Sequence, residues 1–170
     1  TRFGPLYASE VVPSTYLLPV IENKLSLMSA GRVVGGEIGG AYSSFQHNLL
    51  NNLVEIRGGN VRGAPAVYGA RAESGRAGYN SVTIKGGDVD AAVVYGGWSN
   101  TGTVEWNLVD ISDGLVRGDV VVGYGNALVS ANSVLITGGV IDRDVVGGGG
   151  STNVIANTVT ISGVSAPFTN

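Results

Sequence analysis

Two glycine-rich stretches of this sequence have the composition of ligand-binding loops. The run GGGGST at residues 147–152 resembles a phosphate-binding loop, but such a loop needs a Lys before its Ser or Thr and a helix after it. This run has no Lys, and no helical periodicity follows it. The run GGDV at residues 86–89 lacks the Gly-Gly-x-Gly-x-Asp pattern of the calcium-binding nonapeptide. We interpret both stretches as turns and predict no cofactor and no metal ligand.

Paired carboxylates are a second kind of candidate, since a polysaccharide-active β-helix would need a general acid and a general base. The candidate pairs are Asp88 with Asp90, Asp110 with Asp113, and Asp142 with Asp144. The three pairs fall on different faces of the expected strands, so the carboxylates do not converge on one catalytic site. His47 is the single histidine, the chain has no Cys, and no nucleophile-elbow motif occurs. We predict no catalytic residue and a chain that is not an enzyme; a polysaccharide-binding or polysaccharide-active β-helix is an alternative.

Composition limits the class of protein. The 170 residues include 28 Gly and 44% hydrophobic but only 14% charged residues, which favours a folded all-β chain over collagen or disorder. The net charge of −3 gives no electrostatic basis for binding nucleic acid or an anionic membrane. No apolar run is long enough to span a bilayer. The sequence begins at Thr1 rather than Met, and we expect that a preceding segment was removed or left out.

A repeat that starts with Asn organises the chain. Its copies read NKLSL, NLVEI, NSVTI, NLVDI, NSVLI and NTVTI, and they begin at Asn23, Asn52, Asn80, Asn107, Asn132 and Asn157, 25 to 29 residues apart. The third and fifth positions are always aliphatic and the fourth is mostly polar, which predicts a strand with one buried face. We expect the six Asn to form a ladder of side-chain amides along one edge, because Asn tolerates left-handed backbone and bonds to its neighbours above and below.

Two further short strands are expected after each Asn strand. A corner of Gly or another small residue leads to a second apolar element, and a third element ends in a run such as YGG. Three strands in such a unit form one coil of a parallel β-helix. We predict an all-β, single-stranded, right-handed parallel β-helix (a β-solenoid) of about six coils of 25–29 residues. The repeats cover residues 23–164, residues 1–22 form a partial coil, a cap or an inter-subunit strand, and residues 165–170 form a tail.

A charged column supports this register. The position after the apolar residue of the second element is Val34 in the first unit, and then Arg62, Asp90, Arg117 and Asp142 in the following units. Opposite charges on neighbouring strands stabilise a sheet, and each exposed pair contributes roughly 0.2–1 kcal/mol. We predict a charge ladder in which Asp90 lies between Arg62 and Arg117.

Aromatic residues recur near the third corner and in the segments that follow it. The candidates are Tyr68, Tyr95, Trp98, Trp106 and Tyr124. An aromatic stripe on one edge could bind a sugar or a protein partner. The alternative is that these rings cover glycine-rich corners and the groove between coils. We treat the stripe as the candidate binding edge.

The alternation N-x-V-x-I-x-G-G-x-V … V-Y-G-G is similar to the repeats in passenger domains of bacterial autotransporters and related surface adhesins. The resemblance extends over residues 23–163. It implies a secreted, non-enzymatic stalk or adhesin segment at the bacterial cell surface, with a glycan or protein of a host or cell surface as partner. Such passengers are usually much longer, so the resemblance also implies either a fragment or a short chain with another use.

The ends of the expected solenoid favour a second structural hypothesis. Val11 and Val12 lie about as far before Asn23 as a third strand normally lies before the next Asn, and residues 157–164 supply a first strand and the start of a second. Partial coils could join copies head to tail into an extracellular filament, a self-assembling homo-oligomer. The candidate inter-subunit contacts are Val11, Val12, Tyr16, Leu17, Leu18, Val159 and Ile161.

Overall fold

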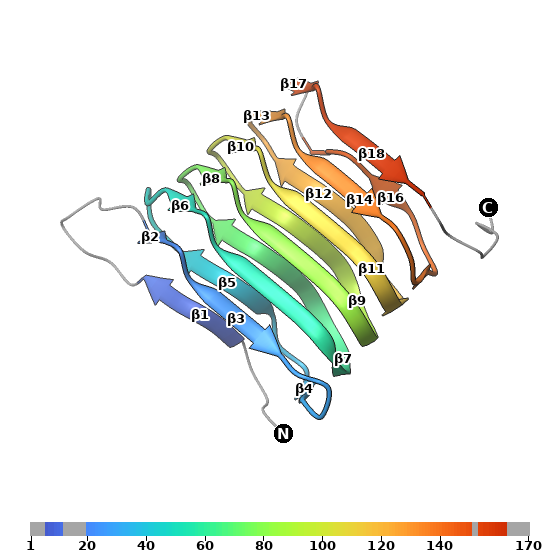
Figure 1. Ribbon diagram of the computed structural model, residues 1–170. Helices are drawn as coiled ribbons and strands as arrows, with labels where there is room; N and C mark the ends of the chain where they lie inside the picture. Colours follow the sequence, from blue (N-terminus) through green and yellow to red (C-terminus); the bar gives the residue numbers. More distant parts are fainter. Residues whose placement is uncertain (1–5, 12–19, 151–152, 163–170) are drawn as a thin grey trace.

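The computed structural model describes residues 6–11, 20–150 and 153–162, which form two parallel β-sheets and no helix (Figure 1). The larger sheet contains β1 (Leu6–Val11), β3 (Lys24–Leu27), β4 (Arg32–Val34), β5 (Ile38–Ser43), β7 (Leu53–Ala72), β9 (Ser81–Ser99), β11 (Leu108–Val116), β12 (Asp119–Gly125), β14 (Ser133–Ile136), β15 (Val140–Ile141), β16 (Val145–Val146) and β18 (Thr158–Ile161). The smaller sheet contains β2 (Val20–Ile21), β6 (Leu49–Leu50), β8 (Ala77–Gly78), β10 (Val104–Glu105), β13 (Leu128–Ser130) and β17 (Asn153–Ile155).

Neighbouring strands come from successive units of the repeat. The long path of the larger sheet, β1-β5-β7-β9-β11-β14-β18, follows chain order, and so does the smaller sheet. Val82 pairs in parallel register with Val54 of the preceding unit and with Val109 of the next, as the repeat alignment predicts. The prediction of an all-β parallel β-solenoid is therefore confirmed, with about five turns. The right-handed sense and the count of six coils stay predictions.

Each coil contains a fourth short strand that the sequence analysis did not predict. The strands of the smaller sheet lie between the third element of one unit and the Asn that begins the next. Leu49, Ala77 and Val104 point inward from these strands and are completely buried. Most of these strands have only two residues, which is too short for an alternating pattern to be visible in the sequence.

The predicted corners lie inside continuous bent strands. β7 and β9 run for 20 and 19 residues through two corners, and their mutual register shifts near Arg57, where a bulge bends the strands. At one corner Gly87 has a φ of 94°, and a Cβ there would lie 2.8 Å from the backbone of the preceding coil at Gly58. Only glycine allows both the positive φ and this close approach of two backbones. The GGDV run is therefore a corner that stacks on the corner of the preceding coil.

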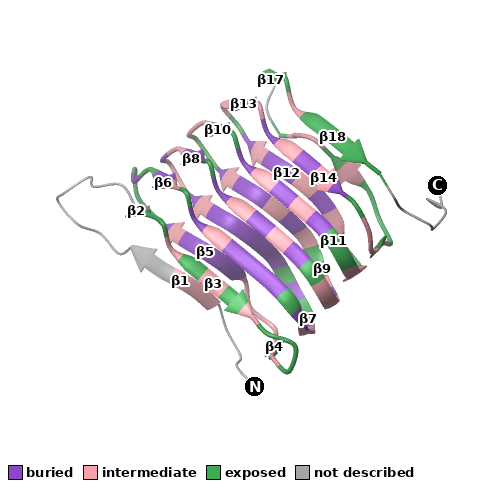
Figure 2. Cartoon of the chain, viewed as in Figure 1, coloured by how far each residue is buried: buried purple, intermediate pink, exposed green. Residues whose placement is uncertain are grey.

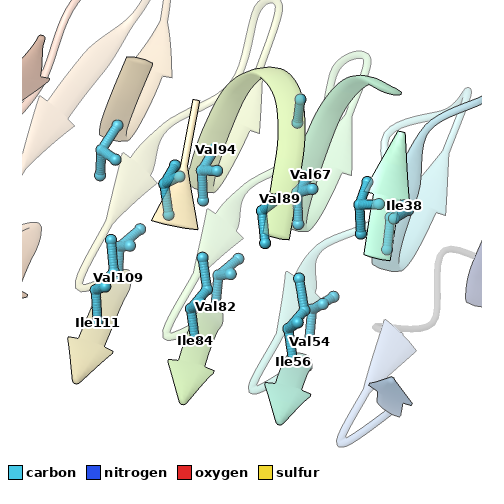
Figure 3. Close-up of a cluster of buried hydrophobic side chains, with 14 of the residues drawn as sticks. Ile38, Val54, Ile56, Val67, Val82, Ile84, Val89, Val94, Val109 and Ile111 are labelled. Carbon is cyan, nitrogen blue, oxygen red and sulfur yellow. The ribbon is translucent and has the colours of Figure 1, made fainter. Parts of the chain in front are cut away.

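The aliphatic columns of the repeat form the core. Val82 and Ile84 of β9 are completely buried and face a second row of side chains that includes Val67 and Val94 (Figure 3). Removing one such side chain from water contributes roughly 1.5–3 kcal/mol. Burial is complete in the middle of the stack and falls toward its ends, where Val159 of β18 is 41% exposed (Figure 2).

The first strand, β1, belongs to the third element of a coil, as predicted, and Val11 is its last residue. In β1, Leu6 pairs with Ile38 of β5 and packs against the core, whereas Val11 pairs with Ser43, so Leu6 occupies the aliphatic position of this element. The connection from this strand to Asn23 is longer than the corresponding connections in later coils, which places the aliphatic position of the strand at Leu6. Four of the proposed inter-subunit residues, Val12, Tyr16, Leu17 and Leu18, lie outside the described residues.

Candidate functional site

The six repeat asparagines form a continuous ladder inside the solenoid. In each coil the backbone N–H and the side-chain Nδ2 donate to Oδ1 of the Asn in the next coil, at 2.8–3.2 Å. Nδ2 also donates to a backbone carbonyl of the smaller sheet, as from Asn80 to Leu49 and from Asn107 to Ala77. The four central members, Asn52, Asn80, Asn107 and Asn132, are buried. The structure therefore brings together all six predicted residues, in the interior rather than along an edge.

The left-handed backbone lies one residue before each Asn. Among the described residues other than glycine, those with positive φ are Glu22, Asn51, Tyr79, Trp106, Ala131 and Ala156, with φ between 53° and 58°. Our expectation that the ladder Asn itself adopts this conformation is wrong. Since the turn is completed by the preceding residue, each Asn keeps ordinary backbone geometry and directs its amide inward.

Glycines of the third element make room for the ladder. A Cβ at Gly97 of β9 would lie 2.6 Å from Nδ2 of Asn107, and one at Gly123 of β12 would lie 2.6 Å from Nδ2 of Asn132. The GG and GYG runs that end the third element are therefore the packing partners of the Asn column. Their composition is explained by this contact rather than by a ligand loop.

The predicted charge ladder uses a different carboxylate. Arg62 and Asp90 are paired in the sheet as predicted, but Arg62 forms its ion pair with Asp88 at 3.1 Å, and Arg117 donates to the same carboxylate from Nε at 2.9 Å. The placement of Asp90 between two arginines as their ion partner is wrong, because these side chains reach diagonally across the sheet. Arg117 also approaches Asp142 at 3.9 Å. The hydrogen bond from Arg117 keeps the pKa of Asp88 below its ordinary value.

A second charged cluster was not predicted. Glu55 of β7 contacts Lys24 Nζ at 2.8 Å, Arg57 Nε at 3.0 Å and Lys85 Nζ at 3.1 Å, and its side chain is almost completely covered. Hydrogen bonds from Lys24, then Arg57 and Lys85, lower the pKa of Glu55 to about 2. Glu55 therefore stays ionised at ordinary pH and links three successive coils. The available signal was a basic residue two positions along from Glu55 on its own strand, Arg57, and two positions along from its partners on the neighbouring strands, Lys24 and Lys85.

The predicted aromatic edge separates into two groups. Tyr68, Tyr95 and Tyr124 form a row on β7, β9 and β12, with ring centroids 5.2 Å and 5.9 Å apart. The guanidinium of Arg71 lies 5.0 Å from the ring centroid of Trp98 and 5.7 Å from that of Tyr68. Tyr68 is only 6% exposed, and burial raises its pKa. Tyr95, Trp98 and Tyr124 are half-buried, so their role as a binding edge stays a prediction.

Trp106 belongs to the second group. Its ring is stacked with that of Tyr79, at 6.3 Å between centroids, in the turns that precede β11 and β9. Arg76 lies 5.2 Å from the Tyr79 centroid and forms an ion pair with Glu105 at 2.6 Å. Tyr79 is not among the predicted binding residues; an aromatic residue directly before a ladder Asn is the signal that would have found this pair.

The chemistry-bearing residues do not converge on one centre. His47 lies in the loop between β5 and β6, where it is buried, and its Nδ1 is 2.9 Å from Ser43 Oγ. Within the described part of the chain, no group of three or more His, Cys, Asp or Glu side chains could hold a metal ion. The same residues contain no helix long and apolar enough to cross a membrane.

Comparison with known proteins identifies no relative. No protein-family model, no curated protein and no solved structure matches the chain.

Proposed function

We propose that this chain is a non-enzymatic structural protein, a β-solenoid stalk or adhesin segment of a bacterial surface. The observation that supports this proposal is the continuity of two internal columns, the aliphatic core and the Asn ladder, through successive coils. Each coil is held by the coils above and below it, as in other solenoids. The clustered polar side chains pair with one another rather than line a reaction centre. The bacterial surface location rests on the resemblance to autotransporter passenger repeats.

Labelling of intact cells tests the location. An epitope tag inserted at Asn126, an exposed residue between β12 and β13, is expected to bind antibody on unpermeabilised cells of the source organism. Exposed loop tips tolerate insertions, so the tag is expected to leave the fold intact. A tagged cytoplasmic protein serves as the control for cell integrity. Labelling of the chain only after permeabilisation would contradict the proposal.

A second structural function, head-to-tail assembly of copies, is favoured by the geometry of the ladder. Among the described residues, Oδ1 of Asn23 accepts no hydrogen bond and the backbone N–H of Asn157 donates none. Inside the ladder, the backbone N–H of each Asn donates to Oδ1 of the Asn in the next coil. Asn157 of one copy could therefore donate to Asn23 of the next, with the exposed Val159 and Ile161 under the aliphatic column of the second copy.

Electron microscopy and light scattering of the purified chain test this assembly. Fibres that lengthen with protein concentration are expected. Val159→Lys places a charge in the aliphatic column at the edge strand and is expected to abolish the fibres. Thr160→Lys changes the neighbouring residue on the other face of β18 and is the matched control, expected to keep them. Monodisperse monomers of the unaltered chain would rule out assembly and leave the stalk proposal standing.

A further inference from the structure

The turn before each ladder Asn holds one residue with positive φ, and in two neighbouring coils this residue is a large aromatic. Tyr79 and Trp106 have φ of 56° and 58°. Bulky side chains are uncommon in this conformation, and such strain often marks a functional position. The fold does not require aromatics here, because Ala131 and Ala156 form the same turn in later coils. The geometry of the turn therefore does not explain why these two positions carry aromatic side chains.

The two rings form a small exposed aromatic surface. They are parallel within 6°, with centroids 6.3 Å apart, and Tyr79 and Trp106 are 48% and 54% exposed. Asn51 and Ala131 occupy the same position in the adjacent coils, so the aromatic surface extends over two coils only. A stable protein–protein interface needs about 800 Å² on each partner, which two rings cannot supply. The size of this surface fits a ligand of one or two rings.

Polar groups border the rings on one side. The guanidinium of Arg76 stacks on Tyr79, and its Nε pairs with Oε1 of Glu105. Both side chains are partly exposed, so this pair offers hydrogen-bond donors and acceptors beside the aromatic surface. Because the two charges are opposite, the site carries no net charge and does not select an ionic ligand.

We propose that Tyr79, Trp106, Arg76 and Glu105 form a binding site for a neutral saccharide. A pyranose ring with equatorial hydroxyls has two faces that expose only C–H groups, and one of these faces would lie on the exposed part of the Trp106 ring. Its hydroxyls, which radiate from the ring edge, would bond to Arg76 and Glu105. This site goes beyond the structural function proposed above and does not depend on it.

Titration with cellotetraose and tetra-N-acetylchitotetraose, two neutral saccharides, tests the site. The chain has two Trp residues, so a Trp98→Phe variant leaves Trp106 as the only indole reporter of fluorescence. Saturable binding of at least one of the two saccharides is expected, by fluorescence and by calorimetry. Trp106→Ala is expected to weaken it about tenfold or more, and Trp106→Phe by about threefold or less, since an aromatic ring is kept. Glu105→Gln is expected to weaken it a few-fold.

Controls separate loss of the site from loss of the fold. Trp106→Ala is expected to fold, because Ala131 and Ala156 occupy this turn elsewhere in the chain, and far-ultraviolet circular dichroism checks it. Trp98→Phe alters a ring in the other aromatic group and is expected to leave calorimetric binding unchanged. The proposal is overturned if neither saccharide binds saturably, or if Trp106→Ala binds as tightly as the unaltered chain. Either result would leave the structural proposal intact.

Discussion

Replacing Asn107 with Ala is expected to lower the free energy of unfolding by about 4 kcal/mol. Oδ1 of Asn107 accepts from the backbone N–H of Asn80 at 2.9 Å, and Nδ2 donates to the carbonyl of Ala77 at 2.9 Å. The Asn107 side chain is 1% exposed, so water cannot replace these bonds. The variant leaves the buried N–H of Asn80 without its acceptor, at a cost of about 1–3 kcal/mol, removes the hydrogen bond to the Ala77 carbonyl, and adds a cavity.

Urea unfolding followed by circular dichroism measures this effect. The matched control is Asn126→Ala, since the Asn126 amide is exposed and donates only to Asn100 at 3.1 Å; its effect is expected to stay within about 0.5 kcal/mol. Asn107→Asp keeps the shape but turns a donor into an acceptor that faces the Ala77 carbonyl and Oδ1 of Asn132. It is expected to be at least as damaging at neutral pH. A loss below about 1 kcal/mol for Asn107→Ala would contradict a ladder that stabilises the fold.

The register of the solenoid was predictable because each copy of the repeat carries the same pattern of aliphatic residues after its Asn. Aliphatic residues at Val82 and Ile84 recur in every copy at the same distance from Asn, and a slip of one residue would expose both columns. The fourth strand was not predictable in the same way. Strands of two residues, such as β8 and β10, have no alternation to detect, and their existence depends on stacking against the coils beside them.

Side-chain partners were less predictable than strand partners. Asp88 and Asp90 point to the same side of β9, and the repeat places Asp90 opposite Arg62. Arg62 and Arg117 have long side chains, and both reach Asp88 instead. A column alignment describes which backbones are neighbours, whereas ion pairs depend on the reach and rotamers of each side chain. The same limit applies to the aromatic edge, which the alignment treated as one stripe.

The glycines beside the ladder lead to a second large effect, at Gly97. A Cβ there would lie 2.6 Å from Cγ and Nδ2 of Asn107, and Asn107 cannot withdraw without breaking its hydrogen bonds. Gly97→Ala is therefore expected to lower the free energy of unfolding by about 2–3 kcal/mol, measured by urea unfolding. Gly149→Ala is the matched control, because its Cβ would meet only Tyr124 at an ordinary 3.5 Å. The control is expected to be neutral or slightly stabilising.

A double-mutant cycle tests whether the glycine column and the Asn ladder are one packing unit. In an Asn107→Ala background the atoms that a Cβ at Gly97 would meet are gone, so Gly97→Ala is expected to cost under about 1 kcal/mol there. The coupling free energy between the two positions is then about 2 kcal/mol. Additive effects, within about 0.5 kcal/mol, would show that the two columns act independently. A measured coupling would mean that the GG run of one unit and the Asn that begins the next unit encode a single contact inside the solenoid.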